Sequence, residues 1–145
     1  MRIVVQRVKR SSVTVNGTVT GSIQNGYMLL VGIAREDDLD KVEMMAGKII
    51  RLRVFEDEKG KMNKAIADVG GGILSVPQFT LLARTDKGNR PGFEDAADPE
   101  KAEKYWNSFN EILEKAGLTV EKGRFGANMQ VSLVNDGPVT FVLDS

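Results

Sequence analysis

The chemistry open to this chain is limited by the residues that it lacks. It contains neither histidine nor cysteine, which excludes Ser-His-Asp triads, cysteine nucleophiles, disulfides and nearly all zinc sites. Acid–base work would fall to carboxylates, lysine, tyrosine, hydroxyls, backbone amides, water or the substrate. We therefore expect no metal and no cofactor.

The segment Leu74–Leu81, LSVPQFTL, combines a proline and a hydroxyl with an apolar run. Because proline cannot donate to a sheet ladder, Pro77 predicts an opening in the strand where backbone groups could face a substrate. Thr80 has two interpretations. The first is a nucleophile, which requires a neighbouring base that the sequence does not supply. The second is a residue that positions a substrate by hydrogen bonding.

Three other stretches are candidates for binding. Lys87 and Arg90 lie in a basic loop, which either contacts a few phosphates or is simply solvated. Phe125, between glycines, either stacks on a nucleobase or belongs to the core. Asn135–Pro138 has the residue types of a turn and predicts a hairpin corner.

The composition is typical of one globular domain over residues 1–145. The chain is 41% hydrophobic and 28% charged, and 20 basic residues balance 20 acidic ones. The apolar runs are too short to span a bilayer, and the N-terminus lacks signal-peptide features. We expect a cytoplasmic protein with no membrane partner, whose contact with nucleic acid, if any, is local.

The predicted elements are strands at both ends of the chain and two main helices. Asn16-Gly17 between alternating valines predicts a β-hairpin, because both turn residues accept positive φ. One helix begins after Asp37 or Asp38; the other has Asp98 as N-cap, Pro99 at its first position and Gly117 just past its end. Further strands are expected at 2–8, 27–34, 53–55, 70–82, 118–123, 128–134 and 138–144. This order indicates a largely antiparallel α+β domain.

Two motifs taken together resemble a known family. VPQFTL (Val76–Leu81) resembles the SQFTL motif of D-aminoacyl-tRNA deacylases, and NDGPVT (Asn135–Thr140) resembles their second motif. The supporting matches follow in the same order along the chain: Gln6–Val8, Ser12–Gly21, Gly60–Asn63, Asn89–Phe93 and Gly123–Val131.

The resemblance implies a single-domain, barrel-like homodimer that hydrolyses the ester joining a D-amino acid, or glycine as in Gly-tRNA(Ala), to the terminal adenosine of a tRNA. Its partner is the aminoacylated 3′ end of tRNA rather than DNA. By the same resemblance, Gln78, Phe79 and Thr80 line the ester. Phe125 and Met129 flank the terminal adenine.

The resemblance also implies a site shared between subunits. Gly137-Pro138 would have a cis peptide bond, reach into the neighbouring subunit's site, hold the substrate's amino group and exclude an L side chain. Arg7 would brace this Gly-Pro element. Such chemistry needs no histidine, because backbone amides can stabilise an oxyanion and the tRNA ribose carries a 2′-OH beside the ester.

Pro77 departs from the family pattern, which has serine at that position. A related animal group has PQATL there and tolerates some L-aminoacyl substrates, but Phe79 and NDGPVT match the D-specific group, so we expect D-selectivity. Two rival hypotheses remain. In the first, Pro77 impairs catalysis and the protein only binds the tRNA 3′ end. In the second, the chain is a general esterase that uses Thr80.

Overall fold

The computed structural model describes residues 1–145 as one α+β domain. Its strands are β1 (Arg2–Val15), β2 (Thr18–Ile23), β3 (Gly26–Gly32), β4 (Arg53–Glu56), β5 (Met62–Ala65), β6 (Gly72–Pro77), β7 (Thr119–Lys122) and β8 (Gln130–Asp144). Its helices are α1 (Leu39–Arg51), α2 (Pro99–Lys115) and the short 3₁₀ helices η1 (Ala67–Val69) and η2 (Phe79–Leu82). No helix is both long and apolar enough to cross a bilayer.

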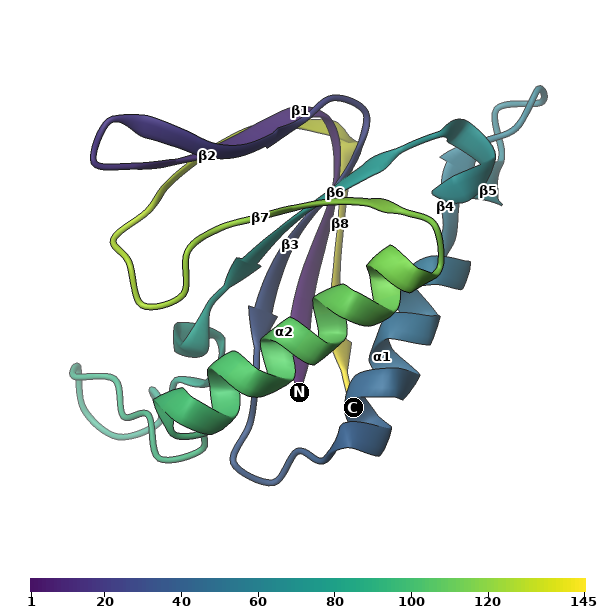
Figure 1. The fold of residues 1–145 in the computed structure, drawn as a ribbon. Helices are drawn as coiled ribbons and strands as arrows, with labels where there is room; N and C mark the ends of the chain where they lie inside the picture. The colour runs from purple at the N-terminus through teal and green to yellow at the C-terminus, as the bar shows by residue number, and fades with distance from the viewer.

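The main sheet has the order β2-β1-β3-β6-β7, with β8 paired to the free side of β1. Antiparallel ladders join β1 to β2, β3 and β8, as expected, whereas β6 runs parallel to both β3 and β7. Parallel neighbours require crossover connections, and here these carry α1 and α2. The far end of the sheet curls so that β2 lies beside β7, which gives a nearly closed, barrel-like shape (Figure 1).

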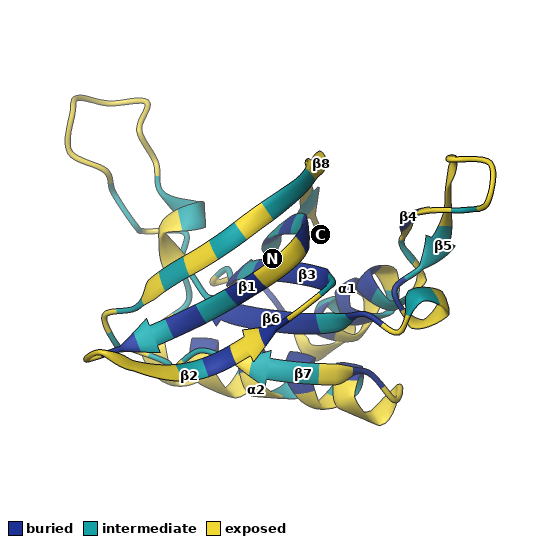
Figure 2. Cartoon of the chain, turned by 90° about the horizontal axis from the view of Figure 1, so that it is seen from above, coloured by how far each residue is buried: buried dark blue, intermediate teal, exposed yellow.

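Both helices pack on one face of the sheet (Figure 1) and bury the larger apolar cluster. Tyr27, Leu29 and Val31 alternate along β3 toward this cluster, as the two-residue period of a strand requires. The residues between them face the opposite side, where a smaller cluster includes Met28 and Leu74. Figure 2 shows the contrast between the buried β3 and β6 and the more exposed β8.

The predicted helix ends are confirmed. Asp38 and Asp98 are the N-caps, and their carboxylates accept hydrogen bonds from Lys41 N and Lys101 N at 2.8 and 3.0 Å. Pro99 stands at the start of α2, and Gly117, just past its end, has a φ of +85°. The Asn16-Gly17 hairpin is also confirmed, with positive φ at both residues.

Two strand predictions are wrong. The strand expected over 70–82 ends at Pro77, because proline has no N–H for the ladder, and the chain turns into η2. The hairpin corner expected at Asn135–Pro138 is instead a bulge within β8, since residues on both sides of it pair with β1. More residues of β8 than of β1 lie between the pairs Gln6–Thr140 and Val8–Asn135, as in a β-bulge.

Candidate active site at the end of the parallel strands

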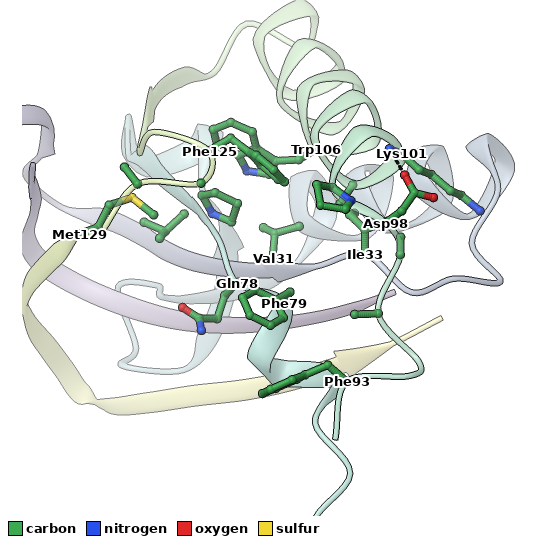
Figure 3. A pocket seen from close by; sticks show the side chains of 18 of the residues that line it. Val31, Ile33, Gln78, Phe79, Phe93, Asp98, Lys101, Trp106, Phe125 and Met129 are labelled. Carbon is green, nitrogen blue, oxygen red and sulfur yellow. Dashed lines mark hydrogen bonds between the residues drawn. The ribbon is translucent and has the colours of Figure 1, made fainter. Parts of the chain in front are cut away.

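A pocket of about 900 Å³ opens where β3 and β6 end, beside the N-terminal end of α2. Five residues predicted for the site line it: Pro77, Gln78, Phe79, Phe125 and Met129. Figure 3 shows Gln78 and Phe79 on one wall, across the pocket from Phe125 and Met129. Segments far apart in sequence therefore enclose one largely apolar cavity with a few polar groups, as small-molecule sites do.

The first wall is formed where the ladder of β6 ends. Pro77 pairs with Val31 of β3, and Gln78 N then donates to the Val31 carbonyl at 2.9 Å. Phe79 and Thr80 begin η2, and the first N–H groups of a helix have no acceptor within it. Neither amide donates in any of the turn, loop or cap hydrogen bonds. Both N–H groups are thus available to a ligand.

Thr80 lies beside this wall but does not line the pocket. It is exposed, and its hydroxyl accepts a hydrogen bond from the Gln78 side-chain amide. An amide N–H donates and cannot act as a base, and no basic side chain hydrogen-bonds the Thr80 hydroxyl. The structure therefore supplies no group that would activate Thr80 as a nucleophile.

The opposite wall is aromatic and sulfur-rich. The rings of Phe125 and Trp106 have centroids 6.2 Å apart and are tilted by 41°. Met129 also lines the pocket, and its sulfur accepts a hydrogen bond from Arg124 N at 3.3 Å. Gly123 leaves room for this sulfur, because a Cβ there would lie 2.8 Å from it. Phe125 and Met129 are thus held together by the backbone of the segment between β7 and β8.

Two pocket aromatics were not predicted as site residues. Trp106 belongs by its spacing to the apolar stripe of α2, and its burial agrees with that, but its ring also lines the pocket. Phe93 stacks edge-on against Phe79, with centroids 4.9 Å apart. The only sequence signal for Phe93 was its place in the matched stretch Asn89–Phe93. Helical periodicity gave no sign that Trp106 belongs to the site, because an apolar stripe on a helix usually faces the core.

The end of the pocket beside α2 carries charge. Arg35, Asp98 and Lys101 line it, and Lys101 Nζ donates to the Arg35 carbonyl at 2.6 Å. The basic residues predicted to contact phosphate, Lys87 and Arg90, lie elsewhere, exposed in the loop between η2 and α2 and outside the pocket lining. The structure thus separates these two loop cations from the cavity.

The Gly137-Pro138 element is also outside the pocket of its own chain. Its peptide bond is cis, in agreement with the resemblance. Arg7 lies against it, with Nε 3.2 Å from Asp136 Oδ2 and Nη1 donating to the Val54 carbonyl at 2.6 Å. Arg7 pairs with Tyr27 at the start of β3, whereas the pocket lies at the end of that strand.

Arg7 is only 5% exposed, and its strand partner Tyr27 is also buried. The Tyr27 hydroxyl donates to the Leu52 carbonyl at 3.1 Å. Burial raises the pKa of Tyr27 well above its ordinary value, and the charge of Arg7 offsets only part of this effect. Tyr27 therefore stays neutral and acts as a structural donor to the Leu52 carbonyl.

Comparison with known proteins decides the family. The model of the D-Tyr-tRNA(Tyr) deacylase family matches residues 4–144. The chain belongs to the D-aminoacyl-tRNA deacylase family. It is 57% identical to the D-aminoacyl-tRNA deacylase of Brevibacillus brevis over 145 residues, covering 100% of both chains. With that of Lactobacillus gasseri the identity is 54% over 144 residues, covering 99% of each.

Two solved structures share this fold over essentially the whole chain. A chain described as the c-Myc DNA Unwinding Element Binding Protein is 48% identical, with a TM-score of 0.94, and the match covers 100% of this chain and 99% of that one. A probable eukaryotic D-amino acid tRNA deacylase is 16% identical with a TM-score of 0.88, covering 99% and 98% of the two chains. The second match supports the fold alone.

Proposed function

We propose that this protein hydrolyses the ester bond of D-aminoacyl-tRNA and releases free D-amino acid and tRNA, in the cytoplasm and in the service of translation quality control. D-aminoacyl-tRNA deacylase is the activity named for its close relatives, and it makes the protein a carboxylic ester hydrolase. One observation carries the proposal. The segment Pro77–Phe79 faces Phe125 and Met129 across a single cavity of about 900 Å³.

In this proposal the terminal adenine of the tRNA lies against Phe125 and Met129. Aromatic faces bind unstacked bases in proteins that recognise single-stranded RNA ends. The ester then lies against Gln78 and Phe79 on the opposite wall, with Thr80 beside that wall. A cavity of this size admits an aminoacyl-adenosine, and the zero net charge of the chain suits a protein that holds only the end of a tRNA.

The oxyanion of the tetrahedral intermediate would be stabilised by the N–H groups of Phe79 and Thr80. These amides stand at the start of η2 without an acceptor in the turns and caps of the chain. Donors that are already oriented stabilise developing charge without reorganisation during the reaction. The ribose 2′-OH beside the ester would supply the activating group that the protein lacks. The same geometry would admit glycine, as in Gly-tRNA(Ala).

Selection of the D-enantiomer would require a second copy of the chain. The chain's own pocket has no contact with Gly137-Pro138, so this element can hold a substrate's amino group only in a neighbouring subunit. The sheet offers a surface for such pairing on the face away from the helices. There Val142, Val4 and Leu30 lie in register across β8, β1 and β3, and Val142 is 60% exposed.

Deacylation of D-Tyr-tRNA and L-Tyr-tRNA tests this function. At catalytic protein concentrations we expect multiple turnovers with the D-substrate and much slower hydrolysis of the L-substrate, even with Pro77 in the family's serine position. Hydrolysis of simple esters without RNA would instead support a general esterase. Saturable tRNA binding with no turnover would support a binding protein disabled by Pro77, and equal rates with both enantiomers would contradict D-selectivity.

Replacing Thr80 by alanine should leave most of the activity. Its hydroxyl has no base beside it and is occupied by the Gln78 amide. We expect kcat within about threefold of wild type, because a positioning group contributes far less than a nucleophile. Thr80→Ser, which keeps the hydroxyl, is the matched control. A decrease in single-turnover rate of about a hundredfold or more in Thr80→Ala alone would show that Thr80 takes part in the chemistry.

A further inference from the structure

Ser75 connects the two walls of the pocket from a fully buried position in β6. Its hydroxyl oxygen accepts a hydrogen bond from the indole N–H of Trp106 in α2, at 2.9 Å. Its carbonyl accepts from Gly123 N, also at 2.9 Å. Further along the same strand is Pro77, where the ester wall begins. A single small residue therefore ties the ester wall both to α2 and to the segment that carries Phe125.

The hydrogen bond to Ser75 selects one orientation of the Trp106 ring. Trp106 is only 4% exposed, and its N–H is satisfied by the Ser75 hydroxyl. A buried indole N–H without an acceptor is unfavourable, so the bond to Ser75 favours the observed orientation of the ring. In the orientation that makes this hydrogen bond, the Trp106 ring lines the pocket and packs against Phe125. The two ring centroids are 6.2 Å apart, and the ring planes are tilted by 41°.

We propose that Ser75 is a positioning residue for the terminal adenosine of the substrate. Through Trp106 it sets the angle of the ring on which Phe125 rests, and through Gly123 it fixes the start of the segment that ends in Met129. This rests on the proposed function, in which Phe125 and Met129 hold the adenine. Ser75 itself does not line the cavity. It acts on binding of the adenosine and leaves the ester chemistry unchanged.

The test compares Ser75→Ala with Ser108→Ala. Ser108 is on the same helix as Trp106, but its hydroxyl donates to the Lys104 carbonyl one turn back. For Ser75→Ala we expect KM for D-Tyr-tRNA to rise roughly tenfold with kcat unchanged, the size of effect produced by one unsatisfied buried donor. Ser108→Ala should behave as wild type in both constants.

Binding can be followed without catalysis, because Trp106 is the only tryptophan in the chain. Adenosine should change its fluorescence in the wild type, and Ser75→Ala should shift the emission and weaken adenosine binding roughly tenfold. Trp106→Phe removes the donor instead of the acceptor, and its adenosine affinity can be measured by calorimetry. If the hydrogen bond is the cause, the double variant will be little worse than either single variant.

The outcomes separate this proposal from the proposed function. A wild type that neither deacylates D-Tyr-tRNA nor binds adenosine would refute the function of the pocket. An active wild type with Ser75→Ala equal to Ser108→Ala, or with a loss confined to kcat, would overturn the role of Ser75. Thermal unfolding of each variant is measured in parallel. If Ser75→Ala does not fold, Trp106→Phe tests the same hydrogen bond: a raised KM supports the role of Ser75, and an unchanged KM overturns it.

Discussion

Replacing Gly137 by alanine is expected to lower kcat/KM for D-Tyr-tRNA at least about a hundredfold, the loss that a misplaced positioning element produces. Gly137 has a φ of +117°, which L-residues with a side chain rarely adopt. An added Cβ would lie 2.7 Å from Val139 Cγ2 and 3.2 Å from Arg7 Nη2. The Gly-Pro element would therefore move away from Arg7, and steady-state deacylation measures the consequence.

Gly117→Ala is the matched control for this prediction. Gly117 also has a positive φ, of +85°, but a Cβ there would meet nothing within 4 Å. It imposes similar backbone strain far from the Gly-Pro element, at the end of α2, and should lose stability without losing specific activity. Equal activity in Gly117→Ala and Gly137→Ala would contradict the proposed role of Gly137.

Gly137→Ala, combined with a second variant, also tests whether the site is shared between two subunits. Ala97→Trp would place an indole in the pocket, since Ala97 lines it. Each variant alone should be inactive. Refolding equal amounts of both chains together should restore about a quarter of wild-type activity, because half of the dimers would be mixed and each would hold one intact site. No recovery, or a monomer in sedimentation experiments, would rule out the shared site.

Replacing Phe125 by alanine is expected to raise KM for D-Tyr-tRNA roughly tenfold to a hundredfold with little change in kcat, the range found for loss of one base–aromatic stack. Phe125 lines the pocket and rests on Trp106, so its removal takes away one face of the adenine site without touching η2. Michaelis–Menten analysis of deacylation separates the two constants.

Phe125→Tyr keeps the ring and is the control for the stacking interaction. It should bind D-Tyr-tRNA nearly as tightly as the wild type does. A fall in kcat with unchanged KM in Phe125→Ala would place the ring near the reacting ester instead. Equal behaviour of the alanine and tyrosine variants would return Phe125 to a role in packing alone.

The features that could be predicted from the sequence depend on backbone conformation at single residues. Asp98, Pro99 and Gly117 marked the ends of α2, since a capping carboxylate, a missing N–H and a positive φ are local requirements. The Asn16-Gly17 hairpin followed for the same reason. Pro77 marked the place where β6 stops, although the 3₁₀ helix that follows it was expected to be strand.

By itself the sequence determined the helix ends, the first hairpin, the break at Pro77 and the restriction to chemistry without histidine or cysteine. Only the tertiary structure decided that Trp106 and Phe93 line the pocket and that Asn135–Pro138 is a bulge opposite β1. The contact of Arg7 with the Gly-Pro element, which the family resemblance had implied, took its geometry from the same long-range pairing, through the Arg7–Asp136 ion pair. Local signals determine φ and the supply of hydrogen bonds, whereas these placements depend on pairing and packing between segments far apart in the chain.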